Sequence, residues 1–87
     1  MENKKIAQLR MKIDNIDESL MSLLDKRADI VKVIGKIKEK QGLPVFNKSR
    51  ENEILLKSQR SGNTQFVNSV FIKILGESRR IQEERWR

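Results

Sequence analysis

The sequence predicts an all-α protein of three helices: a long one, a short one and one of medium length. Apolar residues recur at helical spacing through residues 4–41. Gly42 and Pro44 stop this pattern, and the turn at residues 61–63 (Ser-Gly-Asn) separates two further helical stretches. A chain of 87 residues has room for little more than one domain. We therefore treat residues 1–87 as a single helical domain.

The first predicted helix carries a continuous apolar seam. Written as heptads from Ile6, it has eleven core positions. Gln41 ends the series, and Arg27 places a charge inside the seam, where an unpaired charge is costly. The other nine core positions are branched aliphatic residues: Ile6, Leu9, Ile13, Ile16, Leu20, Leu23, Ile30, Ile34 and Ile37.

The length of this helix predicts a homodimer. Asn3 is a suitable N-cap, and 38 helical residues rise about 57 Å at about 1.5 Å per residue. A compact domain of this size has a radius of gyration of only about 12 Å. One chain cannot cover its own seam, so we expect a second copy to pack against it as an intertwined helical homodimer.

Two shorter helices are expected to fold back along the first. The second covers about residues 48–59, with Asn47 as its N-cap. The third covers about residues 64–85 and is capped by Asn63 or Thr64. Its seam has the same four-three spacing and consists of Val67, Phe71, Ile74, Ser78, Ile81 and Arg85.

The composition excludes several kinds of chemistry. The chain has neither cysteine nor histidine. It therefore lacks thiolate chemistry, the commonest general base and the commonest metal ligand. We expect no metal and no cofactor, and an enzyme built from this chain must run a reaction that needs little proton transfer.

The net charge of +7 points to anionic partners. We do not expect nucleic acid, because the basic residues alternate with 12 acidic ones and only 5% of residues are aromatic. No stretch approaches the roughly 18 apolar residues of a membrane span, and the polar N-terminus does not resemble a signal peptide. We expect a cytoplasmic protein.

Polar residues at inward-facing positions suggest a small binding chamber. Arg27, Ser78 and Gln82 all point inward on this pattern and need partners. Lys38 shares a helix face with Arg27, roughly 16 Å along the axis, and two such long side chains suit the ends of a small molecule. Gly35, one turn before Lys38, is expected to leave room for it.

The second helix adds Arg50 and Glu51 in its first turn, where exposed N–H groups also favour an anion. Simpler explanations exist for each residue taken alone. Arg27 can pair with Asp25, Asp29 or Glu51, Ser78 can bond back to a helix carbonyl, and Lys38 and Gln82 can lie in solvent. Their coincidence favours the chamber.

Five short patterns together resemble the all-helical (type II) chorismate mutase family. They cover essentially the whole chain in the family's order and spacing. They are Leu9-Arg10-x-x-Ile13-x-x-Ile16-Asp17, Leu23-Leu24-x-x-Arg27, Gly35-Lys36-x-Lys38, Pro44-Val45-x-Asn47-x-x-Arg50-Glu51 and Ser78-x-x-x-Gln82.

The resemblance implies a homodimer that rearranges chorismate, a dianion, to prephenate in phenylalanine and tyrosine biosynthesis. This reaction needs no cofactor, base or nucleophile. The implied catalytic residues are Lys38, Gln82 and Arg27. By similarity Arg27 and Ser78 take the ring carboxylate, and Arg10 with Lys38 takes the enolpyruvyl carboxylate. Lys38 and Gln82 hydrogen-bond the ether oxygen.

The resemblance further implies that Glu51 takes the ring hydroxyl and that Arg50 shapes the local field. Asn47 stands where the better-known members carry Asp, and its amide can still cap the helix and accept a hydrogen bond. Arg10 lies roughly 25 Å from Arg27 on the same helix, so it can serve such a site only from the other chain.

Other functions stay open on the sequence. Isochorismate pyruvate-lyase resembles these proteins closely, although Glu51 with Ser78 and Gln82 favours the mutase. A non-catalytic helical dimer or adaptor, in which Arg27 only sets register, is the alternative from another class. The sequence also leaves open whether the protein forms a complex with another shikimate-pathway enzyme.

Overall fold

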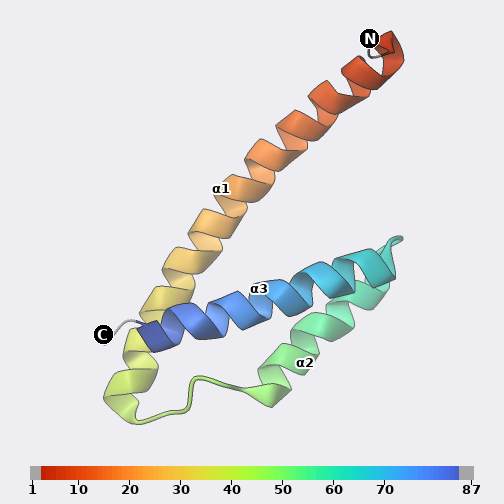
Figure 1. Cartoon of the computed structure of the whole chain (residues 1–87). Helices are drawn as coiled ribbons and strands as arrows, with labels where there is room; N and C mark the ends of the chain where they lie inside the picture. Colours follow the sequence, from red (N-terminus) through yellow and green to blue (C-terminus); the bar gives the residue numbers. More distant parts are fainter. Residues whose placement is uncertain (1–2, 85–87) are drawn as a thin grey trace.

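The computed structural model describes residues 3–84, and within this range it confirms the all-α class. Three α-helices and one 3₁₀ turn follow in the order α1, α2, η1, α3, with no strand among the described residues (Figure 1). Their bounds are Lys4–Gln41 for α1, Lys48–Lys57 for α2, Ser58–Arg60 for η1 and Thr64–Glu84 for α3. The second helix thus changes to a 3₁₀ turn at residue 58, where we had expected α-helix to about 59. Arg85, the expected end of the third helix, lies outside the described residues.

Short polar residues fix the helix ends. The Asn3 side chain accepts a hydrogen bond from the Lys5 backbone N–H at 2.7 Å, which satisfies one of the donors left open at the start of α1. Asn47 does the same for α2, accepting from the Arg50 N–H at 3.0 Å. Gly42 ends α1 in the left-handed region (φ 67°), which glycine adopts without steric cost.

Helix α3 holds the fold together. It packs against the C-terminal part of α1 on one side and against α2 and η1 on the other, whereas α2 makes no close backbone contact with α1. Val31 of α1 and Leu75 of α3 are the two buried apolar side chains among the described residues. Ser58 of η1, also buried, links α2 to α3 because its Oγ donates to the Leu55 carbonyl and accepts from Asn68 Nδ2 at 3.0 Å. The expected folding back along the first helix therefore holds for α3, at the C-terminal part of α1, whereas α2 packs against α3 instead.

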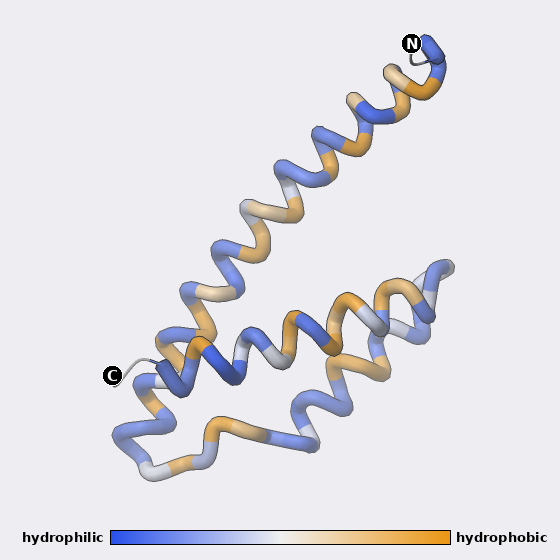
Figure 2. Tube along the Cα trace, viewed as in Figure 1, coloured by the Kyte–Doolittle hydropathy of each residue, from blue (hydrophilic) through white to orange (hydrophobic). Residues whose placement is uncertain are grey.

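The N-terminal half of α1 projects away from the other helices (Figure 1). Asp17 is the only residue between positions 3 and 26 that is not exposed. Figure 2 shows apolar residues recurring along this projecting half as well. The nine aliphatic residues of the predicted seam are between 42% and 62% exposed.

The overall dimensions follow from this arrangement. The radius of gyration is 16.8 Å, well above the roughly 12 Å of a compact chain of this length. The longest extent is 56 Å, set by α1. A single chain leaves its apolar seam uncovered, as its length predicted. Among the described residues, no helix is both long and apolar enough to span a membrane.

Candidate active site

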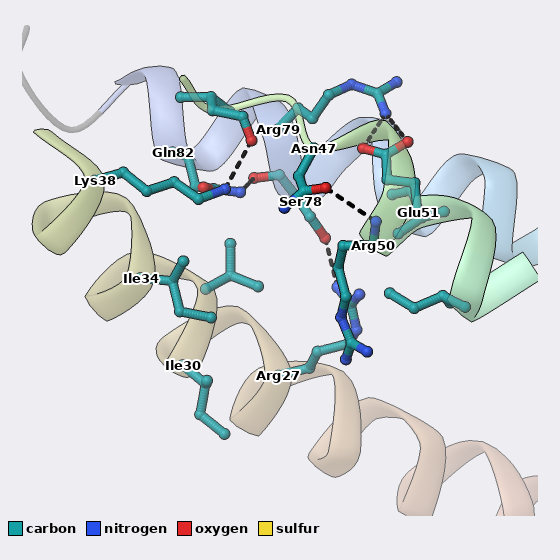
Figure 3. A pocket seen from close by; sticks show the side chains of 14 residues that line it. Arg27, Ile30, Ile34, Lys38, Asn47, Arg50, Glu51, Ser78, Arg79 and Gln82 are labelled. Carbon is teal, nitrogen blue, oxygen red and sulfur yellow. Dashed lines mark hydrogen bonds and ion pairs between the residues drawn. The ribbon is translucent and has the colours of Figure 1, made fainter. Parts of the chain in front are cut away.

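A pocket lies where the C-terminal half of α1, the start of α2 and the end of α3 meet (Figure 3). Its volume is about 380 Å³, within the range of small-molecule sites. Apolar side chains from all three helices and from the loop before α2 form part of its wall. Seven of the eight site residues expected from the sequence line it: Arg27, Lys38, Asn47, Arg50, Glu51, Ser78 and Gln82.

Arg27 reaches the pocket from α1 and is held there by α3. Its Nη1 donates to Ser78 Oγ at 2.5 Å, and that hydroxyl donates onward to the Ile74 carbonyl at 2.7 Å. Pairing of Arg27 with a carboxylate, the simpler alternative, is not what the structure shows. Within residues 3–84 its side-chain partner is this hydroxyl, and Glu51 turns to a different arginine. A guanidinium has five N–H donors, so Arg27 keeps both its charge and most of its donors available to an anion.

Lys38 lines the pocket, and its side chain is partly buried. Its Nζ donates to the Val45 carbonyl at 2.8 Å, which ties the loop of residues 42–47 to the end of α1. The ammonium has three donors, so two remain for a ligand. Figure 3 shows Lys38 and Arg27 entering the pocket from separated turns of α1, as their spacing predicted.

Gln82 enters the pocket from α3, where that helix crosses α1, and is only 7% exposed. Its Nε2 donates to the Ser78 carbonyl at 3.2 Å, and its Oε1 is buried without a hydrogen-bond partner. A buried acceptor without a partner costs free energy, and a donor from a ligand or a water molecule offsets that cost.

Gly35 has a different role from the one we expected. It is buried, and a Cβ built on it meets Gln82 Cγ at 3.0 Å and Gln82 Cα at 3.2 Å. The missing side chain therefore makes room for α3 and the base of Gln82, and not for a ligand. The expectation of a space for a small molecule at Gly35 was wrong because the helix crossing occupies it.

Glu51 is engaged by Arg79, a pocket residue that the sequence analysis missed. Arg79 Nη1 lies 2.5 Å and 2.6 Å from the two Glu51 oxygens. Arg79 follows Leu75 by four residues and precedes Gln82 by three, so all three lie on one face of α3. This spacing was the signal available in the sequence. Arg50, more exposed, pairs with Glu53 at 3.1 Å.

Arg10 is the expected site residue that the structure does not bring to the pocket. It lies on the projecting half of α1, and it is absent from the pocket lining. The helix is continuous from Lys4 to Gln41, so the roughly 25 Å to Arg27 along its axis cannot be closed within one chain.

The pocket carries an excess of positive charge. Arg27, Lys38, Arg50 and Arg79 line it, and Glu51 is the one carboxylate among its described lining residues. Cations around a small concave site attract and orient anions. The arrangement can hold a compact molecule with two negative groups and can offer N–H donors between them.

Arg80, next to Arg79, belongs to the outer surface. It donates to Glu77 and Glu84, and it does not line the pocket. The hydrogen bond from Arg80 and then its charge lower the pKa of Glu77, and the hydrogen bond to Glu77 raises the pKa of Arg80. About half of each side chain is exposed (55% for Arg80 and 42% for Glu77), so solvent and salt screen the pair.

Comparison with known proteins finds sequence similarity along most of the chain. The sequence profile of the family described as chorismate mutase type II matches residues 9–83. A bifunctional chorismate mutase/prephenate dehydratase of Aquifex aeolicus is 41% identical over 68 residues, which are 78% of this chain and 18% of that protein. A chorismate mutase of Methanocaldococcus jannaschii is 35% identical over 51 residues, 59% of this chain and 52% of that protein. The chain spans only 18% to 21% of the length of the first three curated relatives it matches.

A solved structure extends the match to the fold. A conserved hypothetical protein from Pyrococcus furiosus superposes with a TM-score of 0.83 and 36% identity. The match covers 93% of this chain and 99% of that one. The three-helix architecture is thus shared with a solved structure over nearly the whole length of that structure's chain.

Proposed function

The chain belongs to the type II chorismate mutase family, and from this premise we propose that it rearranges chorismate to prephenate. In that reaction one ether C–O bond breaks while one C–C bond forms, and no proton leaves or enters. A site for it must hold a dianion in a compact, reactive conformation and stabilise charge on the ether oxygen. The observation that carries the proposal is the meeting of Arg27, Lys38 and Gln82 around one pocket of suitable size.

Arg27 binds one carboxylate of the substrate in this proposal. Its guanidinium is already oriented by the bond to Ser78, so little side-chain entropy is lost when the anion arrives. Ser78 contributes a second donor only if its hydroxyl releases the Ile74 carbonyl, because a hydroxyl has a single hydrogen. We therefore assign Ser78 first to holding Arg27 and second to direct contact with the carboxylate.

Lys38 and Gln82 supply the donors for the ether oxygen. Lys38 has two N–H donors left after its bond to Val45, one for the enolpyruvyl carboxylate and one for the ether oxygen. The Gln82 amide nitrogen carries two hydrogens, of which the Ser78 carbonyl takes one. The other is available where negative charge develops, and donors placed in advance at such a position lower the barrier.

Glu51 accepts a hydrogen bond from the substrate's ring hydroxyl, and Arg50 adds positive potential at the mouth of the pocket. Asn47 lines the same edge, and its Oδ1 is committed to capping α2. Its amide nitrogen remains as a donor toward the ligand. The replacement of a carboxylate by an amide at this position removes a negative charge beside a dianionic substrate.

We propose that the working form is a homodimer in which the apolar seams of two α1 helices cover each other. The exposed aliphatic residues along α1 support this, since burying each apolar Å² contributes about 25 cal/mol. In this dimer Arg10 of each chain completes the pocket of the other. It would bind the enolpyruvyl carboxylate beside Lys38.

The experiment that tests the function is the disappearance of chorismate absorbance with the purified chain at neutral pH. Wild type should consume chorismate and release prephenate, and the Arg27→Ala variant should not. If the protein instead leaves chorismate unchanged and releases pyruvate from isochorismate, its activity is that of the lyase. A folded protein inert toward both substrates would leave a helical adaptor as the function.

We also propose that the module works beside another enzyme of aromatic amino acid synthesis. The support is the Aquifex aeolicus relative, whose name combines chorismate mutase with prephenate dehydratase. Mixing this chain with a separately purified prephenate dehydratase should give a complex that elutes earlier in size-exclusion chromatography. Independent elution at micromolar concentration would remove this part of the proposal.

A further inference from the structure

An ion pair in the pocket, Glu51–Arg79, and the aromatic ring that contacts it come from three separate segments of the chain. Glu51 comes from α2, Arg79 from α3, and Phe46 from the loop between α1 and α2. The Arg79 guanidinium carbon lies 5.5 Å from the centre of the Phe46 ring, a distance at which a cation is attracted to the ring face. The Glu51 side chain is 18% exposed and that of Arg79 is 35% exposed. The carboxylate is therefore the more enclosed partner, and the arginine is fixed on two sides.

This pair answers a difficulty that Glu51 creates. Glu51 is the one carboxylate among the described residues that line a pocket otherwise suited to anions. A carboxylate placed a few ångströms from a dianionic ligand repels it, and partial burial makes that repulsion stronger than in water. A site that uses Glu51 must therefore offset its charge without occupying the lone pairs that a hydroxyl needs.

The observed geometry does both. A single nitrogen of Arg79 approaches both Glu51 oxygens, so the arginine engages the carboxylate from one side. A carboxylate has about four lone-pair sites, and this contact leaves the others open. The side chain of Glu51 is also prevented from turning toward Arg27 or Arg50, whose N–H groups the ligand requires.

We propose that Arg79 is a positioning residue that acts through Glu51: it offsets the carboxylate's charge and aims it at the substrate's ring hydroxyl. This inference rests on the proposed function, because it concerns the hydroxyl-bearing dianion of that reaction. It adds to the site a residue whose role lies in affinity for the substrate, with little share in the stabilisation of the ether oxygen. Its loss should therefore raise KM more than it lowers kcat.

The test compares Arg79→Met with Arg79→Lys and with Arg80→Met as a matched control. Arg80 is the neighbouring arginine of the same helix; it pairs with two glutamates of its own helix, on the outer surface, and does not line the pocket. Arg79→Met should lower kcat/KM for chorismate about tenfold or more, chiefly through KM, since it leaves a partly buried carboxylate unpaired. Arg79→Lys should recover most of the loss, and Arg80→Met should behave as wild type.

Coupling to Glu51 separates this role from a purely structural one. In a Glu51→Gln background the charge to be offset is gone, so adding Arg79→Met should change kcat/KM by less than about twofold. If Arg79→Met does not fold, Arg79→Gln replaces it in this double-mutant cycle with Glu51→Gln. Thermal unfolding is measured for every variant. A structural tie alone would lower the unfolding temperature without changing KM.

The possible failures are distinguishable. Wild type and Arg80→Met both inert toward chorismate would overturn the proposed function and, with it, this role of Arg79. An active wild type with Arg79→Met equal to Arg80→Met would overturn the role of Arg79 alone. Losses that multiply in the Glu51→Gln Arg79→Met double variant would show that Arg79 acts independently of Glu51, which also overturns it.

Discussion

Arg10 offers a direct test of whether two chains share each site. We consider two inactive variants, Arg10→Ala and Arg27→Ala, each purified alone. Each should lose at least about 100-fold in kcat/KM, because each removes a charged donor to a substrate carboxylate. The two variants are then unfolded together in equal amounts and refolded, so that the chains exchange partners.

The structure gives the expected recovery. Arg10 and Arg27 lie about 25 Å apart on one unbroken helix, so a chain's own Arg10 cannot reach its own pocket. Random pairing in a two-fold dimer puts one chain of each kind in about half of the dimers. In such a dimer the Arg10→Ala chain keeps its own Arg27 and receives an intact Arg10 from its partner, while the second site lacks both. One complete site in half of the dimers restores about 25% of wild-type activity.

The assay is chorismate depletion before and after exchange, with both parents as blanks. A mixture of Arg27→Ala with Lys38→Ala is the matched control, because both residues belong to the same pocket and no pairing rebuilds it. This control should stay inactive. The reasoning is refuted if the Arg10→Ala and Arg27→Ala mixture stays as inactive as its parents, or if Arg10→Ala alone is as active as wild type.

Three further substitutions probe individual contacts. Arg27→Leu should abolish activity and raise the free energy of unfolding by about 1 kcal/mol, measured by urea titration. Stability rises because an apolar residue suits the seam and because Ser78 keeps its bond to the Ile74 carbonyl. Loss of both activity and stability would contradict this prediction. Gln82→Glu should be active mainly in acid, near pH 5, because only a protonated carboxyl group can donate to the ether oxygen. Equal rates from pH 5 to about pH 8 would exclude the assigned contact. Gly35→Ala forces α3 to shift by a few tenths of an ångström around Gln82. It should lower kcat about tenfold with under about 1 kcal/mol lost in urea titration, as helix propensity offsets crowding. Unchanged kcat would show that the crossing tolerates the extra methyl group.

Local chemistry explains what the sequence could predict. Asn3 and Asn47 cap their helices through short side chains whose partners lie two or three residues away, so the pattern alone identifies them. Gly42 ends α1 for an equally local reason. Helix periodicity also placed Arg27 and Gln82 on the faces that meet, and the structure brings both to the pocket.

The missed features depend on how the helices cross. Arg79 meets Glu51 only because the 3₁₀ turn and the loop at residues 61–63 set where α2 lies against α3. The sequence shows that Gly35 has no side chain, and this suggested space for a ligand. It does not show that Gln82 of α3 fills that space. Contacts between segments distant in sequence need the crossing geometry, and no local pattern supplies it.

The uncovered half of α1 has a consequence for folding. With only two apolar side chains buried among its described residues, one chain recovers little of the roughly 1–2 kcal/mol of entropy lost per ordered residue. If a second copy supplies the missing core, folding and association become one equilibrium, and the unfolding midpoint must rise with protein concentration. Each tenfold dilution then removes about 1.4 kcal/mol of stability. Any attachment that keeps two copies close raises their effective concentration and protects the fold without adding a contact to it.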